Sequence, residues 1–161
     1  MTIIDTHAHL DHLEDLDGAL ERARQAGVEG IVAVSVDLAA CKKNLEIKRK
    51  TTAPKIHVAL GMHPGNINPA EVDECVKFIR ANIAEAAAIG ETGLDYWYPW
   101  VKKEKGKKEE QHKIFELQLG LAREYDLPIV IHSRGAWRDC LDMTQKAGVK
   151  KALFHWYSGP V

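Results

Sequence analysis

The first residues of the chain place two histidines and an aspartate at alternate positions. The stretch Asp5-Thr6-His7-Ala8-His9 stands at the end of an apolar run. In a β-strand, residues two apart point to the same face, so Asp5, His7 and His9 would lie side by side. Imidazole and carboxylate groups pack poorly together but are common ligands of divalent cations. The spacing therefore indicates half of a metal site, whose other ligands must come from elsewhere in the chain.

Further candidate ligands stand where later apolar runs end. They are His63, Glu91, His132 and His155. A histidine at the end of a single strand is more often a hydrogen-bonded core or surface residue than a ligand. The recurrence of His or Glu at the same relative position in several strands is what argues against chance. A carboxylate among histidines could bridge two cations about 3.5–4 Å apart, which makes Glu91 the candidate bridging ligand.

Other polar residues near these strand ends could act on a substrate. Arg134 could hold a phosphate or a carboxylate through two hydrogen bonds, or could be an exposed residue at a helix start. His63 in GMHP and Asp95 in GLDY could contact substrate or orient a ligand. The segment WYPWVKKEKGKKEEQ (97–111) combines aromatic and basic residues, which suits single-stranded nucleic acid, although a solvated linker is the simpler interpretation.

Short β-branched runs alternate with amphipathic stretches along the whole chain. The predicted strands are 2–7, 30–36, 55–61, 86–92, 127–133 and 151–156, and the predicted helices are 14–26, 38–52, 69–85, 109–126 and 135–147. Apolar strands separated by helices indicate βαβ units and a parallel sheet covered by helices. The sequence therefore predicts an α/β fold.

Two α/β architectures fit this pattern, an open doubly wound sheet and a closed TIM (β/α)8-type barrel. A barrel brings the C-terminal ends of all strands to one mouth, whereas an open sheet gathers only those near its switch point. The candidate ligands stand at most of these ends, so we favour the barrel, with about six strands present. Because a full barrel needs eight strands and about 250 residues, we expect residues 1–161 to form a single metal-dependent hydrolase domain that is incomplete at its C-terminus. Its open sheet edges could promote self-association.

The composition is that of an ordinary globular protein, with 45% hydrophobic residues, 28% charged residues and a net charge of −1. This charge excludes a uniformly basic nucleic-acid coat but allows a local basic patch. Cys41, Cys75 and Cys140 form no CxxC pair and are expected to be reduced thiols. The sequence has neither a signal-peptide pattern nor an apolar run long enough to cross a membrane. We therefore expect a cytoplasmic protein with no membrane partner.

Taken together, five motifs resemble the TatD family of metal-dependent deoxyribonucleases, which are relatives of the amidohydrolases. They are DTHAHLD, GMHP, GETGLDY, LPIVIHSR and FHWYSG, and they occur in the family order along nearly the whole chain. The resemblance implies a TIM barrel that holds two divalent cations, such as zinc, magnesium or manganese. His7 and His9 would bind one cation. Glu91 would bridge both, and His132 and His155 would bind the other.

The chain departs from the family pattern in two places. The family's aspartate at the end of the eighth strand has no counterpart within the 161 residues. The sixth motif has Trp156 and Tyr157 where the family more often has Cys and Phe. The first departure would leave one cation without its carboxylate ligand, and the second could reshape the substrate pocket.

The ligand pattern and the resemblance together predict hydrolysis of phosphodiester bonds in nucleic acid. The family pattern implies exonuclease removal of nucleotides from DNA ends, with Glu91, His63 and Arg134 as catalytic residues. One alternative is a metal-dependent esterase or amidohydrolase that acts on a non-nucleic substrate. A second alternative is an inactive partial barrel that lacks the last metal ligand.

Overall fold

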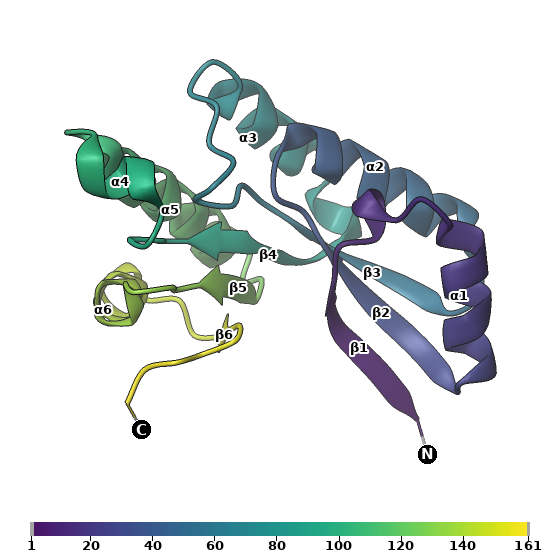
Figure 1. Cartoon of the computed structure of the whole chain (residues 1–161). Helices are drawn as coiled ribbons and strands as arrows, with labels where there is room; N and C mark the ends of the chain where they lie inside the picture. Colours follow the sequence, from purple (N-terminus) through teal and green to yellow (C-terminus); the bar gives the residue numbers. More distant parts are fainter. Residues whose placement is uncertain (1, 161) are drawn as a thin grey trace.

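A single parallel sheet organises the chain in the computed structural model, which describes residues 2–160 (Figure 1). Its strands are β1 (Ile3–Ala8), β2 (Val28–Val34), β3 (Lys55–Leu60), β4 (Ala86–Gly93), β5 (Ile129–His132) and β6 (Ala152–Phe154). Strands that are neighbours in the chain are neighbours in the sheet, and every pair is parallel. A doubly wound sheet reverses its strand order, so this unbroken order is that of a TIM-type barrel and confirms the predicted fold class.

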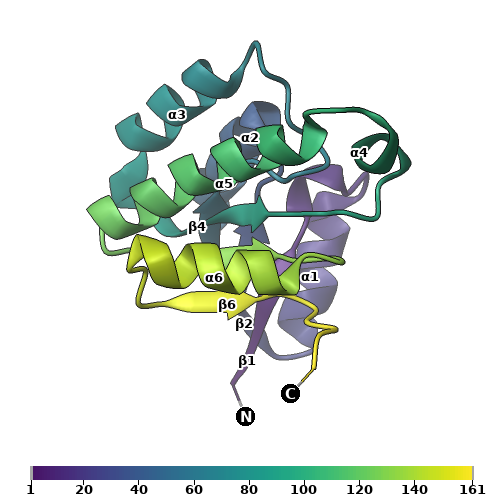
Figure 2. The ribbon, with the colours of Figure 1, turned by 90° about the vertical axis from the view of Figure 1, so that its left-hand side faces the viewer.

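The connections between strands pass through helices that cover the outer side of the curled sheet (Figures 1 and 2). They are α1 (Leu16–Gln25), α2 (Leu38–Lys50), α3 (Val72–Ala81), α4 (Pro99–Lys103), α5 (Lys107–Glu124) and α6 (Trp137–Ala147), with short 3-10 turns η1 (Leu10–His12) and η2 (Ile83–Glu85). The six strands form a half-barrel. Among these described helices, none has the length and apolarity that crossing a membrane requires.

The alternation of side chains along the strands divides the core into two layers. Ile129 and Ile131 of β5 belong to the large cluster between the sheet and the helices. Val130, between them, belongs to a small inner cluster of β-strand residues. His132 continues the alternation of Val130 and therefore points to the inner side of the half-barrel. The same period of two that fills the core thus directs a polar side chain toward the mouth.

The two outermost strands each have one partner within the described residues. β1 pairs only with β2, and β6 pairs only with β5. Ile3 and Ile4 on β1 and Leu153 on β6 are exposed. Exposed apolar side chains of this kind are expected at sheet positions that lack a neighbouring strand.

Two helical regions differ from the sequence-based expectation. α3 begins at Val72 and not near Pro69, because Asn68 forms a turn in which its Oδ1 accepts a hydrogen bond from the backbone N of Ala70 (3.2 Å). α4 lies within the segment 97–111, where the sequence predicts no helix before residue 109. A helix of five residues carries little periodic signal, and Pro99 at its first position was the available indication.

A side-chain cap fixes the start of α2. Oδ1 of Asp37 accepts a hydrogen bond from the backbone N of Ala40 at 2.8 Å. Asp37→Ala should therefore lower the free energy of unfolding by about 1 kcal/mol in urea denaturation. Asp142→Ala, at an exposed position in the middle of α6, should change it by less than about 0.5 kcal/mol. Equal effects of the two substitutions would contradict the capping role.

Candidate metal centre

Glu91, at the end of β4, lies at the centre of a cluster of histidines. Its side chain is only 4% exposed, and its Oε2 is 3.3 Å from Nε2 of His7. The same oxygen is 3.7 Å from Nε2 of His9. The other oxygen, Oε1, is 3.2 Å from Nδ1 of His132. The structure therefore brings together ends of β1, β4 and β5, with one carboxylate between two sets of histidines.

His155, just after β6, joins the cluster beside His7. Their rings are stacked, with centroids 3.4 Å apart and an interplanar angle of 5°. One group of candidate ligands contains His7, Glu91 and His155, and a second contains His63, Glu91 and His132, with ligand atoms in each group within 4.8 Å of one another. The geometry thus places His155 with His7, whereas the family resemblance pairs it with His132.

The cluster has the spacing and the chemistry that a divalent cation requires. Two ligand atoms about 2.1 Å from one cation lie roughly 3.0–3.4 Å apart at octahedral or tetrahedral angles. The contacts of Glu91 with His7 and His132 fall in this range. In addition, both ring nitrogens of His7 and Nδ1 of His9 are buried without a hydrogen-bond partner among the described residues. Such orphaned atoms are costly unless something binds them, so the residues present fit a cation.

The ionisation of two of the histidines and of the carboxylate suits metal binding. Burial lowers the pKa of His9 and of His155, and the neighbouring His7 lowers the pKa of His155 further. Burial raises the pKa of Glu91, but the close contacts with the His132 and His7 rings outweigh it and hold that pKa below its ordinary value. Neutral imidazoles and an ionised carboxylate are the forms that bind cations.

Asp95, in the loop after β4, orients two of the predicted site residues. Its buried Oδ2 accepts hydrogen bonds from Nε2 of His132 (2.8 Å) and Nε of Arg134 (2.7 Å). Its Oδ1 accepts one from the backbone N of Trp97 (2.8 Å). A carboxylate at Nε2 keeps the imidazole proton there and leaves Nδ1 of His132 free to bind a cation. Of the two roles that the sequence leaves open for Asp95, the geometry supports the orienting one.

His63 faces the same cluster through Nε2, while its Nδ1 is held by the backbone. Its Nδ1 accepts a hydrogen bond from the backbone N of Gly65 at 3.0 Å. Burial, reinforced by the neighbouring His132, lowers the pKa of His63 to about 4, so the ring is neutral near pH 7. A neutral imidazole that accepts at Nδ1 carries its proton on Nε2. That Nε2 lies 4.0 Å from Oε1 of Glu91, where it can donate to a substrate rather than ligate a cation.

Two buried glutamines of α5, which the sequence analysis missed, hold the loops that carry these residues. Oε1 of Gln111 accepts a hydrogen bond from the backbone N of Asp95 (3.0 Å), and its Nε2 donates to the carbonyl of Pro64 (3.3 Å). Gln118 bonds both the backbone N and the carbonyl of Met62, at 2.8 and 3.0 Å. The two residues are seven positions apart, which is two turns of one helix face. This spacing was the signal that could have revealed them.

A cavity of about 280 Å³ opens over the cluster at the mouth of the half-barrel. It is lined by His9, His12, Val36, His63, Asn66, Glu91, His132, His155 and Trp156. A ligand in this cavity would therefore meet imidazoles from the ends of four strands and the loops that follow them, together with the shared carboxylate.

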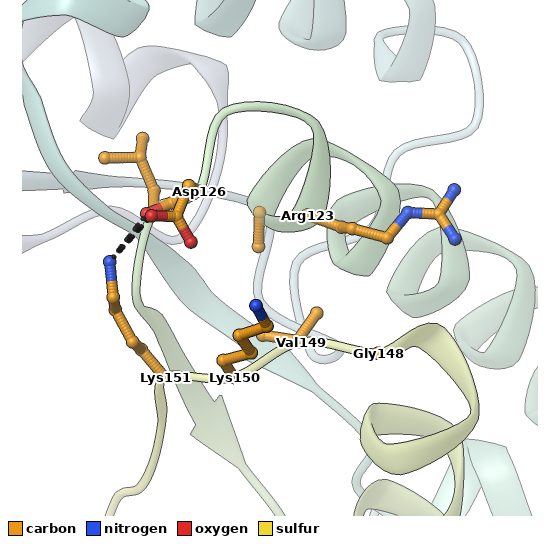
Figure 3. Close-up of a pocket in the computed structure, with 8 residues that line it drawn as sticks. Arg123, Asp126, Gly148, Val149, Lys150 and Lys151 are labelled. Carbon is orange, nitrogen blue, oxygen red and sulfur yellow. Dashed lines mark hydrogen bonds and ion pairs between the residues drawn. The ribbon is translucent and has the colours of Figure 1, made fainter.

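A smaller pocket, of about 170 Å³, lies at the opposite ends of β5 and β6 (Figure 3). The loops that enter these strands form it, and Lys151 pairs with Asp126 within it at 3.0 Å. Arg123 extends away from this pair (Figure 3). The pocket has no histidine and its carboxylate is already paired, so the chemistry of a metal site is confined to the mouth within the part of the chain described.

The chain is similar to a known protein family and to several of its members. The family model described as TatD related DNase matches residues 4–161. The chain is 31% identical to human deoxyribonuclease TATDN3 over 98% of its own length and 61% of that protein. It is 34% identical to the uncharacterized metal-dependent hydrolase YabD of Bacillus subtilis, again over 98% of the chain and 61% of the relative.

A solved structure shows the same fold. The TatD homologue YjjV of Escherichia coli matches with a TM-score of 0.84 at 27% identity, over 98% of this chain and 61% of that one. The chain thus spans about three fifths of the length of these relatives. By its sequence, its motifs and its fold, the chain belongs to the family of TatD-related DNases.

Proposed function

We propose that the chain hydrolyses phosphodiester bonds in nucleic acid, with Glu91 as the ligand shared by two divalent cations. The observation that carries this proposal is one buried carboxylate, Glu91, whose Oε2 faces His7 and His9 and whose Oε1 faces His132. Bound cations would supply an activated water and would neutralise charge on a phosphodiester. The name of the human relative, a deoxyribonuclease, supports nucleic acid as the substrate.

The ligand set that we propose is His7, His9, Glu91, His132 and His155. His7 and His9 face Oε2 of Glu91, and His132 faces Oε1, so the two oxygens would hold different cations. A set this rich in imidazole suits zinc better than magnesium, which prefers oxygen ligands.

Arg134 and His63 would act on the phosphodiester itself. Arg134 uses Nε for Asp95, and its two terminal nitrogens make no hydrogen bond within the described residues. They can therefore take two phosphate oxygens together, which fixes the substrate and stabilises the charge that develops during attack. Nε2–H of His63 would donate to a third oxygen. Both are catalytic residues in this proposal.

Metal loading and cleavage assays on the 161-residue chain test the proposal. We expect two equivalents of zinc or manganese, and cation-dependent cleavage of bis(p-nitrophenyl) phosphate and of an end-labelled single-stranded oligonucleotide, both lost in EDTA. Products that shorten by one nucleotide at a time would support an exonuclease. Cleavage of p-nitrophenyl esters or anilides alone would favour an esterase or amidohydrolase, and a chain that binds no metal would favour an inactive partial barrel.

The setting of the activity is part of the proposal. The three cysteines are buried free thiols, which supports a reducing, cytoplasmic location for this single hydrolase domain. The open edges of β1 and β6 are where self-association would occur. Sedimentation of the purified chain at several concentrations would test whether it self-associates.

A further inference from the structure

The loop after β4 carries an exposed tryptophan into the space between two neighbouring loops. Trp97 is 62% exposed. It lies against Gly135, in the loop after β5, where a Cβ would collide with the ring. Tyr98 lies likewise over Gly65, in the loop after β3, where a Cβ would stand 2.6 Å from its hydroxyl. Two aromatic rings therefore pack closely against glycines at the mouth, one in the loop after β3 and one in the loop after β5.

These rings adjoin the residue that we propose to hold phosphate. The guanidinium of Arg134 lies over the ring of Tyr98, 4.8 Å from its centroid. Asp95 joins the two, because it accepts hydrogen bonds from Nε of Arg134 and from the backbone N of Trp97. Tyr98 also stacks on Trp100 with ring centroids 4.2 Å apart, so it is occupied on that side. Trp97 remains the aromatic ring beside Arg134 whose surface is largely free.

The lysines that follow Trp97 in the chain indicate which kind of ligand could bind beside it. Between residues 97 and 111 the chain has five lysines and three glutamates. Lys107 pairs with Glu110 and Lys108 lies over the ring of Tyr96, which leaves the exposed Lys102, Lys103 and Lys105 on and just after α4. A flat exposed ring that lies against Gly135, next to Arg134 in the chain, and precedes a segment with exposed lysines suits an unpaired nucleobase on an anionic backbone.

Trp97 lies in the loop after β4, a strand that is paired on both sides, and this makes its exposure informative. Trp156 is more exposed, at 88%, but it follows β6, which is an edge strand, so its exposure depends on what lies beside that edge. β4 has a partner strand on each side, and the loops after β3 and β5 both contact the aromatic residues that follow it. Trp97 is therefore exposed although β4, the strand before it, is paired with both β3 and β5.

We propose that Trp97 stacks on a base of single-stranded nucleic acid whose phosphate Arg134 holds, and thereby makes the site select single strands. This inference rests on the proposed function for its substrate class. Bases within a duplex are already stacked on one another and cannot present a face to the indole. A strand with unpaired bases can do so while its backbone follows Arg134 and the lysines.

Binding of a fluorescent ten-nucleotide thymidine strand, measured by anisotropy in EDTA at low salt, tests the proposal without requiring hydrolysis. Trp97→Ala should weaken binding roughly 5- to 150-fold, the range that loss of one base–aromatic stack gives. An abasic strand with the same number of phosphates should lose less than about 2-fold, because its contacts are electrostatic. Trp97→Phe is the matched control and should keep most of the affinity for the thymidine strand.

The pattern of losses decides the outcome. Equal weakening of both strands by Trp97→Ala would assign Trp97 a structural or electrostatic role and overturn the inference, as would no weakening of either. Base-dependent loss in a chain that fails to cleave phosphodiesters when loaded with cations would support the stacking role and overturn the proposed function. Normal cleavage with no base-dependent loss would overturn the stacking role alone.

Discussion

Glu91→Gln should reduce the metal content of the chain from two cations to less than one and lower phosphodiester cleavage by at least about 100-fold. Glutamine keeps the shape of the buried side chain but removes its charge and replaces one oxygen by an NH2 group without a lone pair. Oε2 faces His7 and Oε1 faces His132, so this one substitution weakens both cation sites. Replacement of any single histidine should weaken mainly one.

Elemental analysis after dialysis and steady-state cleavage rates measure these two effects. Glu116→Gln is the matched control, because Glu116 is exposed on α5 away from the strand ends. It should keep both cations and the full rate. Retention of two cations by Glu91→Gln at the affinity of the unchanged chain would contradict the role of Glu91 as the shared ligand.

The fold could be predicted from the sequence because its signals are local. Apolar β-branched runs such as the one that forms β5 identify buried strands, and the predicted bounds of all six strands lie within two residues of the structure. Polar residues at the strand ends then favoured the barrel over the open sheet. α4 escaped prediction because its five residues show no usable period, whereas the 18 residues of α5 do.

The candidate site could be predicted only in part, because its members meet through the curl of the sheet. The sequence indicates that His7 and His155 both stand at strand ends, but their stacking depends on how far β1 and β6 approach each other across the half-barrel. The roles of Gln111 and Gln118 depend on burial against loops more than 40 residues away along the chain. Long-range contacts of this kind leave little trace in residue type alone.

Asp95→Asn should release the cation on the His132 side, leave the other in place, and lower cleavage about 10- to 100-fold. Asparagine offers one oxygen where aspartate offers two. If that oxygen stays on the backbone N of Trp97, the NH2 group faces Nε2 of His132, which must then accept a hydrogen bond. The imidazole proton moves to Nδ1, so the atom facing Glu91 loses the lone pair that a cation needs. Asp142→Asn on α6 is the matched control.

Asp95 bonds both His132 and Arg134, and Arg134→Ala removes only the second of these contacts. The substitution should weaken substrate binding and slow cleavage while both cations remain. Arg134 donates its hydrogen bond to Asp95 through Nε and donates none to a candidate metal ligand among the described residues. If Asp95 positions both His132 and Arg134, combining Asp95→Asn with Arg134→Ala should lower kcat/KM by less than the product of the two single effects. Part of the loss is then shared between the two substitutions. A product of independent effects, with metal content unchanged in Asp95→Asn, would show that Asp95 does not set the imidazole proton. Metal content measured beside kcat/KM therefore distinguishes a residue that prepares a ligand from one that only steadies a phosphate-binding arginine.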